Sequence, residues 1–380
     1  MTTTGVTAAL TAPFLMALGF VIWDVYWKKG GGSAFALNCF KCNLASIGFL
    51  ILASTARDAP FSSSIYTTNS VGYLILSSII GILIGDNVWL EALRLIGAQR
   101  VIIIDTAKPF IAALLGWAIL GEDIRGAAFG GIAVTVVGVL IVSLEKERIN
   151  ETKKVDLSAA HTTIATRDND NEKGVSTENK YTVSTNVIDL DTSTFSDNAA
   201  TPDATDKMQF SSSNLYRGYF FALVNVILDT YASLLTKQHG EMYNTWEINL
   251  IRFGFSGVVT LLVSLLMRVH EHFWTENVDE KSTSDAVAWY KMPRLSKLAW
   301  GKISTGVLFV TFLCPALSNY ALFQLTLALA LTLTSITPLY ALPLVWVFKQ
   351  ERPTTRGYIG AIIAVVGIII LSVFGVKNND

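Results

Sequence analysis

The sequence predicts an all-α integral membrane protein with ten transmembrane helices, arranged as two inverted five-helix repeats. Of the 380 residues, 51% are hydrophobic, and the mean hydropathy is +0.45. The charged residues gather between apolar runs. Most of these runs have a length close to the roughly 20 residues that a helix needs to cross a bilayer. We expect these runs to be helices, because a spanning helix satisfies its own backbone hydrogen bonds. The formal net charge of -1 says little about partners.

The apolar runs form two sets. The spans before Lys146 are predicted at 8–28, 34–54, 71–93, 101–121 and 125–144. Those after Arg217 are predicted at 218–237, 247–268, 303–324, 325–348 and 357–375. The N-terminal stretch "MTTTGVTAAL" lacks the basic region of a cleaved signal peptide, so we expect the first span to be retained.

Two polar segments separate the spans. Residues 145–216 are rich in Ser, Thr, Asn and Asp with little apolar periodicity, which predicts a disordered linker. The segment 269–302 contains several aromatic residues that favour a partial location at the membrane interface. The chain is therefore divided into a first repeat at 8–144, the linker, and a second repeat at 217–376.

The duplication is visible at fixed offsets. A shift of 229 aligns residues 92–143 with 321–372 without a gap, and a shift of 205 aligns "ALGFVIWDVY" (17–26) with "ALVNVILDTY" (222–231). Shared Pro, Trp, Glu and Gly in one register indicate an internal repeat. An odd number of spans inverts the second copy, which predicts a site near the midplane between the repeats. The identical pairs include Pro109/Pro338, Trp117/Trp346, Glu122/Glu351 and Gly138/Gly367.

Residues 85–142, "GDNVWLEALRLIGAQRVIIIDTAKPFIAALLGWAILGEDIRGAAFGGIAVTVVGVLIV", resemble one EamA repeat of the drug/metabolite transporter superfamily. The second half resembles it through Pro338, "QERP" and "GIIIL". The resemblance implies the ten-helix inverted-repeat fold and transport of a small metabolite, commonly an amine, amino acid, nucleotide sugar or sugar phosphate. It leaves the substrate open, and transport by alternating access, proton-coupled or by exchange, is the expectation. The sequence departs from the family pattern where Asp24 follows Trp23 and where Lys108 precedes Pro109.

Charged residues inside spans are candidates for function, because lipid disfavours an unpaired charge. Asp24 and Lys41 lie equally far from the predicted turn between their helices, as do Asp229 and Arg252. Equal distance from a turn means equal depth, so two equivalent ion pairs are predicted. They either fix helix register or serve as a protonation or substrate-charge site, and breaking such a buried pair is costly in both cases.

A second group lies on the fourth predicted span. Asp105 and Lys108 are three residues apart and share a helix face, and Pro109 loosens the helix there by removing a backbone donor. An unpaired Lys108 would suit a phosphate or carboxylate. Under the shift of 229, the matching residues are Thr334 and Thr337, which offer hydroxyls or simply satisfy their own helix carbonyls.

Weaker candidates lie toward the predicted cavity mouths. Gln324 is one, with Asn319 and Tyr320 nearby. Trp89 is interpreted as an interfacial anchor, and Glu122 as a solvated helix end. The candidates to contact substrate or coupling ion are therefore Asp24, Asp229, Lys41, Arg252, Asp105, Lys108, Gln324, Thr334 and Thr337.

No cofactor, metal site or nucleic-acid partner is predicted; the expected partners are a small-molecule substrate and the lipid bilayer. The spacing Cys39-x-x-Cys42 resembles a metal site, but small packed residues in an apolar helix are the better interpretation. The Lys and Arg distribution places the linker in the cytosol, whereas the family resemblance implies cytosolic termini. Which membrane holds the protein is left open.

Two other functions compete with transport. Two intramembrane aspartates are the elements of an aspartyl protease, and "IGD" at 84–86 is one glycine short of its motif. Basic partners at equal depth argue against a dyad, which needs two carboxylates sharing a proton. The third possibility is a transport-inactive receptor or scaffold that acts through the linker. We expect no enzyme activity.

Overall fold

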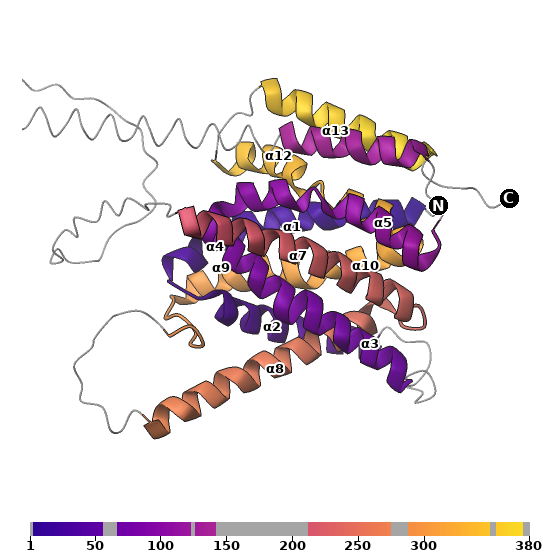
Figure 1. Ribbon diagram of the computed structural model, residues 1–380. Coiled ribbons are helices and arrows are strands. Elements are labelled where there is room, and N and C mark those ends of the chain that lie inside the picture. The colour runs from indigo at the N-terminus through magenta and orange to yellow at the C-terminus, as the bar shows by residue number, and fades with distance from the viewer. Residues whose placement is uncertain are drawn as a thin grey trace, which may run out of the picture. The chain divides into compact units, whose positions relative to one another are not determined.

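The structure is a computed structural model that describes residues 3–55, 67–122, 126–141, 212–274, 288–349 and 355–374. Every regular element in these ranges is a helix (Figure 1). The first half contains α1 (Thr3–Lys29), α2 (Ala34–Thr55), α3 (Thr68–Ser78), η1 (Ile79–Gly85), α4 (Asp86–Asp105), α5 (Lys108–Leu120) and the helix Gly126–Ile141. The second half contains α7 (Ser212–His239), α8 (Thr245–Trp274), α9 (Lys297–Val307), η3 (Leu308–Leu313), α10 (Cys314–Gln324), α11 (Leu327–Thr334), α12 (Thr337–Lys349) and α13 (Thr355–Phe374).

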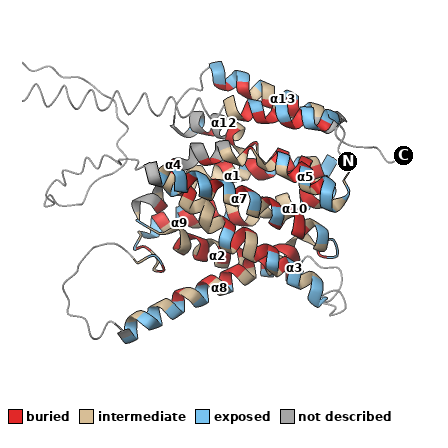
Figure 2. Cartoon of the chain, viewed as in Figure 1, coloured by how far each residue is buried: buried red, intermediate tan, exposed pale blue. Residues whose placement is uncertain are grey.

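The helices have the length and composition of membrane spans. Figure 2 shows exposed residues along much of α8 and α13, and many of them are large apolar side chains such as Leu262, Leu266 and Ile362. The protein is therefore an integral multi-pass membrane protein. In the described ranges, six helical stretches are long and apolar enough to cross a bilayer: Thr3–Trp23, Ala34–Thr55, Thr68–Ile96, Asn214–His239, Thr245–Phe273 and Lys297–Gln324. Four apolar helices in the same ranges are shorter: Lys108–Leu120, Gly126–Ile141, Leu327–Tyr340 and Thr355–Ile370.

Both polar segments are shorter than predicted. Helix α7 begins at Ser212, inside the predicted linker, and the rest of that linker lies outside the described residues. Helix α8 continues to Trp274 and α9 begins at Lys297, so the predicted segment 269–302 is helical at both ends. No Gly or Pro stops α8 between Arg268 and Trp274, and helices tend to continue until such a residue.

The fourth and ninth predicted spans are each interrupted. The fourth is interrupted near its start, because α4 continues through the predicted connection at 94–100, and the ninth near its middle. Thr106–Ala107 separates α4 from α5, and Ser335–Ile336 separates α11 from α12. The two breaks are related by the same shift of 229 that aligns the sequences. Pro109 and Pro338 each follow at the second position of the next helix, where their missing N–H groups cost no helical bond. The duplication thus includes a discontinuity in the backbone.

A second backbone feature recurs at the same shift. The π-helical segments η1 and η3 begin at residues 79 and 308, and such wide turns are often found at functional sites. In η1, the buried Asn38 of α2 donates to the Ile82 carbonyl at 3.0 Å, and Asn225 of α7 donates to the Gly85 carbonyl at 3.0 Å. Side chains from neighbouring helices therefore satisfy carbonyls where the helix is irregular, as non-standard backbone in a membrane requires.

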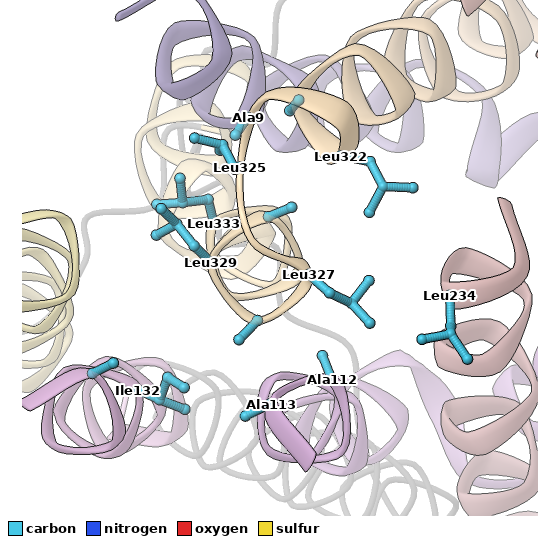
Figure 3. Close-up of a cluster of buried hydrophobic side chains, with 14 of the residues drawn as sticks. Ala9, Ala112, Ala113, Ile132, Leu234, Leu322, Leu325, Leu327, Leu329 and Leu333 are labelled. Atoms are coloured by element: carbon cyan, nitrogen blue, oxygen red, sulfur yellow. The ribbon is translucent and has the colours of Figure 1, made fainter. Parts of the chain in front are cut away.

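The short helix α11 is enclosed by other helices. Figure 3 shows Leu327 on the side of Ala112 of α5, whereas Leu329 and Leu333 point to another side of α11, and all of them belong to one buried apolar cluster. Because lipid tails are as apolar as leucine, close packing and not removal from water stabilises this contact. Figure 1 shows α4 beside α7, and these helices are in contact. The packing of α11 fixes the position of the break between α11 and α12. Helices α4 and α7 carry charged residues that are described next.

Candidate substrate site

Lys108, at the start of α5, lies between two carboxylates. Its Nζ is 3.3 Å from Oδ1 of Asp105, across the break from α4, and 3.0 Å from Oδ2 of Asp229 on α7. The Lys108 side chain is 19% exposed and that of Asp229 is 40% exposed. We call Asp105, Lys108 and Asp229 the Lys108 cluster. It joins the two halves of the chain, carries one excess negative charge, and presents Asp229 as its most accessible member.

Trp89 belongs to this site, contrary to the prediction of an interfacial anchor. Its Nε1 donates to Oδ2 of Asp105 at 3.4 Å, and its ring lies 5.8 Å from that of Phe20 on α1. An indole N–H that is buried generally finds an acceptor, and here the acceptor is a carboxylate at the helix break. Trp89 therefore helps to orient Asp105.

Lys41 on α2 is paired with Asp86, the first residue of α4. The sequence predicted Asp24 as its partner, and the side chain of Asp24 lies outside the described residues. Asp86 was not among the predicted site residues, although it stands within an apolar run. The criterion that selected Asp24, a charge inside a predicted span, would also have selected Asp86.

Arg252 is not paired with Asp229 in this structure, which corrects the second predicted ion pair. Asp229 is ten residues before the end of α7, whereas Arg252 is only seven residues after the start of α8. At 1.5 Å per residue this offsets them by roughly 4–5 Å in depth. The prediction assumed a symmetric turn, and the turn between the two helices is not centred where the sequence placed it.

Arg252 is instead buried, and no acid among the residues that the structure describes is in contact with it. The residue is 8% exposed, and its Nε has no hydrogen-bond partner. The acids that act electrostatically on its guanidinium are Asp229 and Asp86. A buried cation in this state is a marker of function in a membrane protein.

The hydroxyls of the second break serve their own backbone. Thr334 donates to the Leu331 carbonyl at 3.1 Å, and Thr337 donates to the Thr334 carbonyl at 3.2 Å. The interpretation that these threonines satisfy their own helix carbonyls therefore describes both. The charged pair of one break has no charged counterpart in the other.

A cavity of about 1270 Å³ opens where α1 begins and where α7 and α10 end. Hydroxyl and amide side chains line much of it, including Thr4, Thr7, Thr11, Tyr320 and Gln324. The predicted position of Gln324 near a cavity mouth agrees with this lining. No member of the Lys108 cluster lines the cavity, so the cavity and the charged cluster are separate features.

Asn319 lies deeper than predicted for a residue at the mouth. It is buried, and its Nδ2 donates to Oδ1 of Asn249 at 2.8 Å. Asn249 occupies the position of α8 that matches Asn38 of α2 in the alignment of "INLIR" with "LNCFK". Buried amides therefore join neighbouring helices in both halves.

Glu122 is not the solvated helix end that the sequence suggested. Its side chain is 12% exposed, and Oε1 is 2.6 Å from Nζ of Lys237 on α7. The Leu327 backbone N–H at the start of α11 donates to both carboxylate oxygens, at 3.0 and 2.9 Å. Carboxylates are favoured at helix N-termini by the helix dipole. Glu122 thus connects α5 to α7 and α11 at the wall of the cavity.

Comparison with known proteins agrees with this architecture. The chain is 37% identical over 60 residues to the permease-like protein YdzE of Bacillus subtilis (strain 168), which is 16% of this chain and 77% of that protein. A protein of known crystal structure superposes with a TM-score of 0.61 at 12% identity, covering 99% of this chain and 100% of its own, and shares the fold. The sequence profile of the EamA-like transporter family matches residues 3–144 and 285–373, more than half of the chain. The protein belongs to the EamA-like transporter family.

Proposed function

We propose that the protein moves a small polar metabolite across its membrane by alternating access between two inverted five-helix repeats, 8–144 and 217–376, with ten transmembrane helices in all. The observation that supports this best is the Lys108 cluster, which joins charges from both halves at a helix break. In secondary transporters, substrate and ion sites lie between repeats at discontinuous helices. The breaks and the π-helical segments that recur at a shift of 229 are consistent with this plan.

The charge of the cluster favours particular ligands. Lys108 already has two carboxylates within 3.3 Å, so it is poorly suited to hold a substrate phosphate or carboxylate. Asp229 is accessible and shares its cation with Asp105, so a proton or a hydrogen-bond-donating group of the substrate can compete for it. The cluster therefore supports proton coupling or exchange, with Asp229 as the ligand-facing residue.

An aspartyl protease is disfavoured by the same geometry. A catalytic dyad needs two carboxylates that share a proton, and here the Lys108 ammonium bridges Asp105 and Asp229. Asp86, in the "IGD" stretch, is bound to Lys41. Neither arrangement leaves a carboxylate pair free to activate water.

The experiment is uptake by reconstituted proteoliposomes. The panel contains radiolabelled amines, amino acids, sugar phosphates and nucleotide sugars, each tested with and without an imposed proton gradient. We expect saturable uptake of at least one solute, and loss of that uptake in Asp229→Asn. The matched control is Glu271→Gln, which alters a half-exposed ion pair with Lys291 outside the cluster. A folded protein that moves no solute would contradict transport and favour the scaffold.

The topology requires a separate measurement. A single cysteine placed in 145–216 and treated with an impermeant maleimide on intact cells reports the side of the linker. The charge distribution predicts no labelling. Strong labelling would instead support the orientation that the family resemblance implies.

A further inference from the structure

The cations near η1 are unequally paired. Lys108 contacts two carboxylates, Lys41 contacts one, and Arg252 is within ion-pair distance of none in the part of the chain that the structure describes. The Nε of Arg252 is buried without a hydrogen-bond partner. A buried charge without compensation is strongly destabilising. Among the described side chains, which do not include that of Asp24, one lysine therefore contacts two acids and the arginine contacts none.

A single regrouping would pair every one of these charges. If Asp229 moved to Arg252, Lys108 would keep Asp105 and Lys41 would keep Asp86. Three cations and three acids would then match one to one. The observed and regrouped arrangements differ only in the partner of Asp229.

The geometry places Arg252 within reach of this exchange. Its Nη2 lies 3.4 Å from the position that a Cβ would occupy at Gly81 of η1, and the same position is 2.8 Å from Cβ of Ala232. Ala232 is three residues after Asp229 on α7, so the two share a helix face one turn apart. One turn is roughly 5 Å, and Gly81 places no side chain between the guanidinium and α7. The segment η1 contacts both α7 and α8. A change of Arg252 rotamer with a small shift of α8 against η1 would bring the guanidinium toward Asp229.

The exchange would also change what holds the two halves together. Lys108 is on α5 in the first half, whereas Asp229 and Arg252 are on α7 and α8, which follow one another along the chain in the second half. The observed pair crosses between the repeats, and the regrouped pair lies within one repeat. We propose that Asp229 exchanges Lys108 for Arg252 when the protein passes from this conformation to the oppositely facing one, which makes Arg252 a positioning residue for transport.

This proposal rests on the alternating conformations of the proposed function, and its first test follows the cavity itself. Thr7 lines the cavity, and a Thr7→Cys reporter reacts with an impermeant maleimide while the cavity is open. The three native cysteines are buried and react slowly. In the reporter chain, Lys108→Gln frees Asp229 for Arg252, so labelling should slow by about tenfold, a shift expected between two states of similar stability.

The reversal is the decisive comparison. Adding Arg252→Gln to Lys108→Gln removes the cation that would otherwise hold Asp229. The labelling rate should then return to within about twofold of that of the Thr7→Cys reporter chain. Arg252→Lys in the same Lys108→Gln background keeps the positive charge and should leave labelling slow. A structural role for Arg252 predicts no such rescue, because a second lost charge would only add to the damage. If Lys108→Gln/Arg252→Gln labels as slowly as Lys108→Gln, the exchange is excluded.

A second measurement applies if Lys108→Gln does not fold. Paired cysteines are placed one helical turn after the charged residues, at Ala232 with Ala112 and at Ala232 with Ser256, so that all three charges are kept. Membranes are then treated with a short bifunctional thiosulfonate. The exchange predicts that both pairs cross-link and that an Ala232/Ala45 pair does not. Cross-linking of the Ala232/Ala112 pair alone would overturn the proposal.

Neither measurement needs a known substrate, so the two hypotheses can fail separately. Reversal of labelling without any solute uptake would support the exchange and contradict transport. Uptake without reversal or double cross-linking would leave transport intact and exclude the exchange.

Discussion

The two helix breaks have the same backbone position but different chemistry. The break between α4 and α5 is flanked by Asp105 and Lys108, and the break between α11 and α12 by Thr334 and Thr337 at the positions 229 residues later. The first is charged and tied to α7 through Asp229. The second is neutral and satisfies its own carbonyls. The two breaks thus share a backbone position while only the first carries charge, which fits the proposed site for one asymmetric solute.

The largest effect should come from removing the cation of the charged break. Lys108→Gln leaves Asp105 without a positive partner in contact and releases Asp229, so we expect a loss of about 3–5 kcal/mol in the free energy of unfolding and loss of uptake. Thermal unfolding in detergent and proteoliposome uptake measure the two effects.

The control is Lys291→Gln, which removes a half-exposed ion pair with Glu271. Its loss should lower the free energy of unfolding by about 1 kcal/mol or less. Equal stability of Lys108→Gln and Lys291→Gln would show that the charged break is not energetically distinct.

A smaller loss is expected when the charged break is converted to the chemistry of the neutral one. Asp105→Thr/Lys108→Thr removes the cation together with one carboxylate, leaving fewer unpaired charges than Lys108→Gln alone. The free energy of unfolding of this double variant should therefore lie between that of the wild type and that of Lys108→Gln. Uptake should be abolished. Retained uptake in this double variant would mean that the difference between the breaks is incidental.

Substituting the two prolines distinguishes the effect of the backbone break from the effect of the charges. Pro109→Ala and Pro338→Ala each restore an N–H at the second position of a helix, so each should change stability by about 1 kcal/mol or less. Only Pro109→Ala adjoins the Lys108 cluster, so only it should slow uptake, and by several-fold. Comparable slowing by both variants would indicate that both breaks bend during transport.

The smallest effect on uptake is expected at the neutral break. Thr337→Val keeps the shape of the side chain and removes the hydrogen bond to the Thr334 carbonyl, at a cost of about 0.5–1.5 kcal/mol. Uptake should stay near the wild-type level. A loss of uptake as large as that of Asp229→Asn would move Thr337 into the ligand site.

The sequence predicted the membrane character and the family, and both are confirmed. Apolar runs and the shift of 229 could be read directly because they depend on residue type and order. The ion pairs could not be read in this way: Asp229 pairs with Lys108 because the break beside Pro109 brings α5 against α7, a contact between distant segments. Asp86 could have been found, since it is a charge inside an apolar run, and its pairing with Lys41 required the packing of α2 on α4.

Glu122 shows a second limit. An acid after a Gly at a helix end is typical of a solvated position, and its burial depends on α11 beginning directly opposite. The ninth span was predicted to begin at 325, close to the observed start of α11 at Leu327. The sequence could not show that this helix start packs against Glu122, because the two residues are 205 positions apart.

The π-helical segment η1 also determines the directions in which the side chains of the following helix, α4, point. A wide turn takes up an extra residue, and one residue of an α-helix corresponds to about 100° of rotation. Asp86 is the first residue after η1, so its direction toward Lys41 depends on that extra residue. Deleting one residue from η1 would turn Asp86 away from Lys41 while keeping the helix apolar and long enough to span. The hydrogen bonds from Asn38 and Asn225 stabilise the wide turn of η1. They therefore also fix the helical register in which Asp86 points toward Lys41.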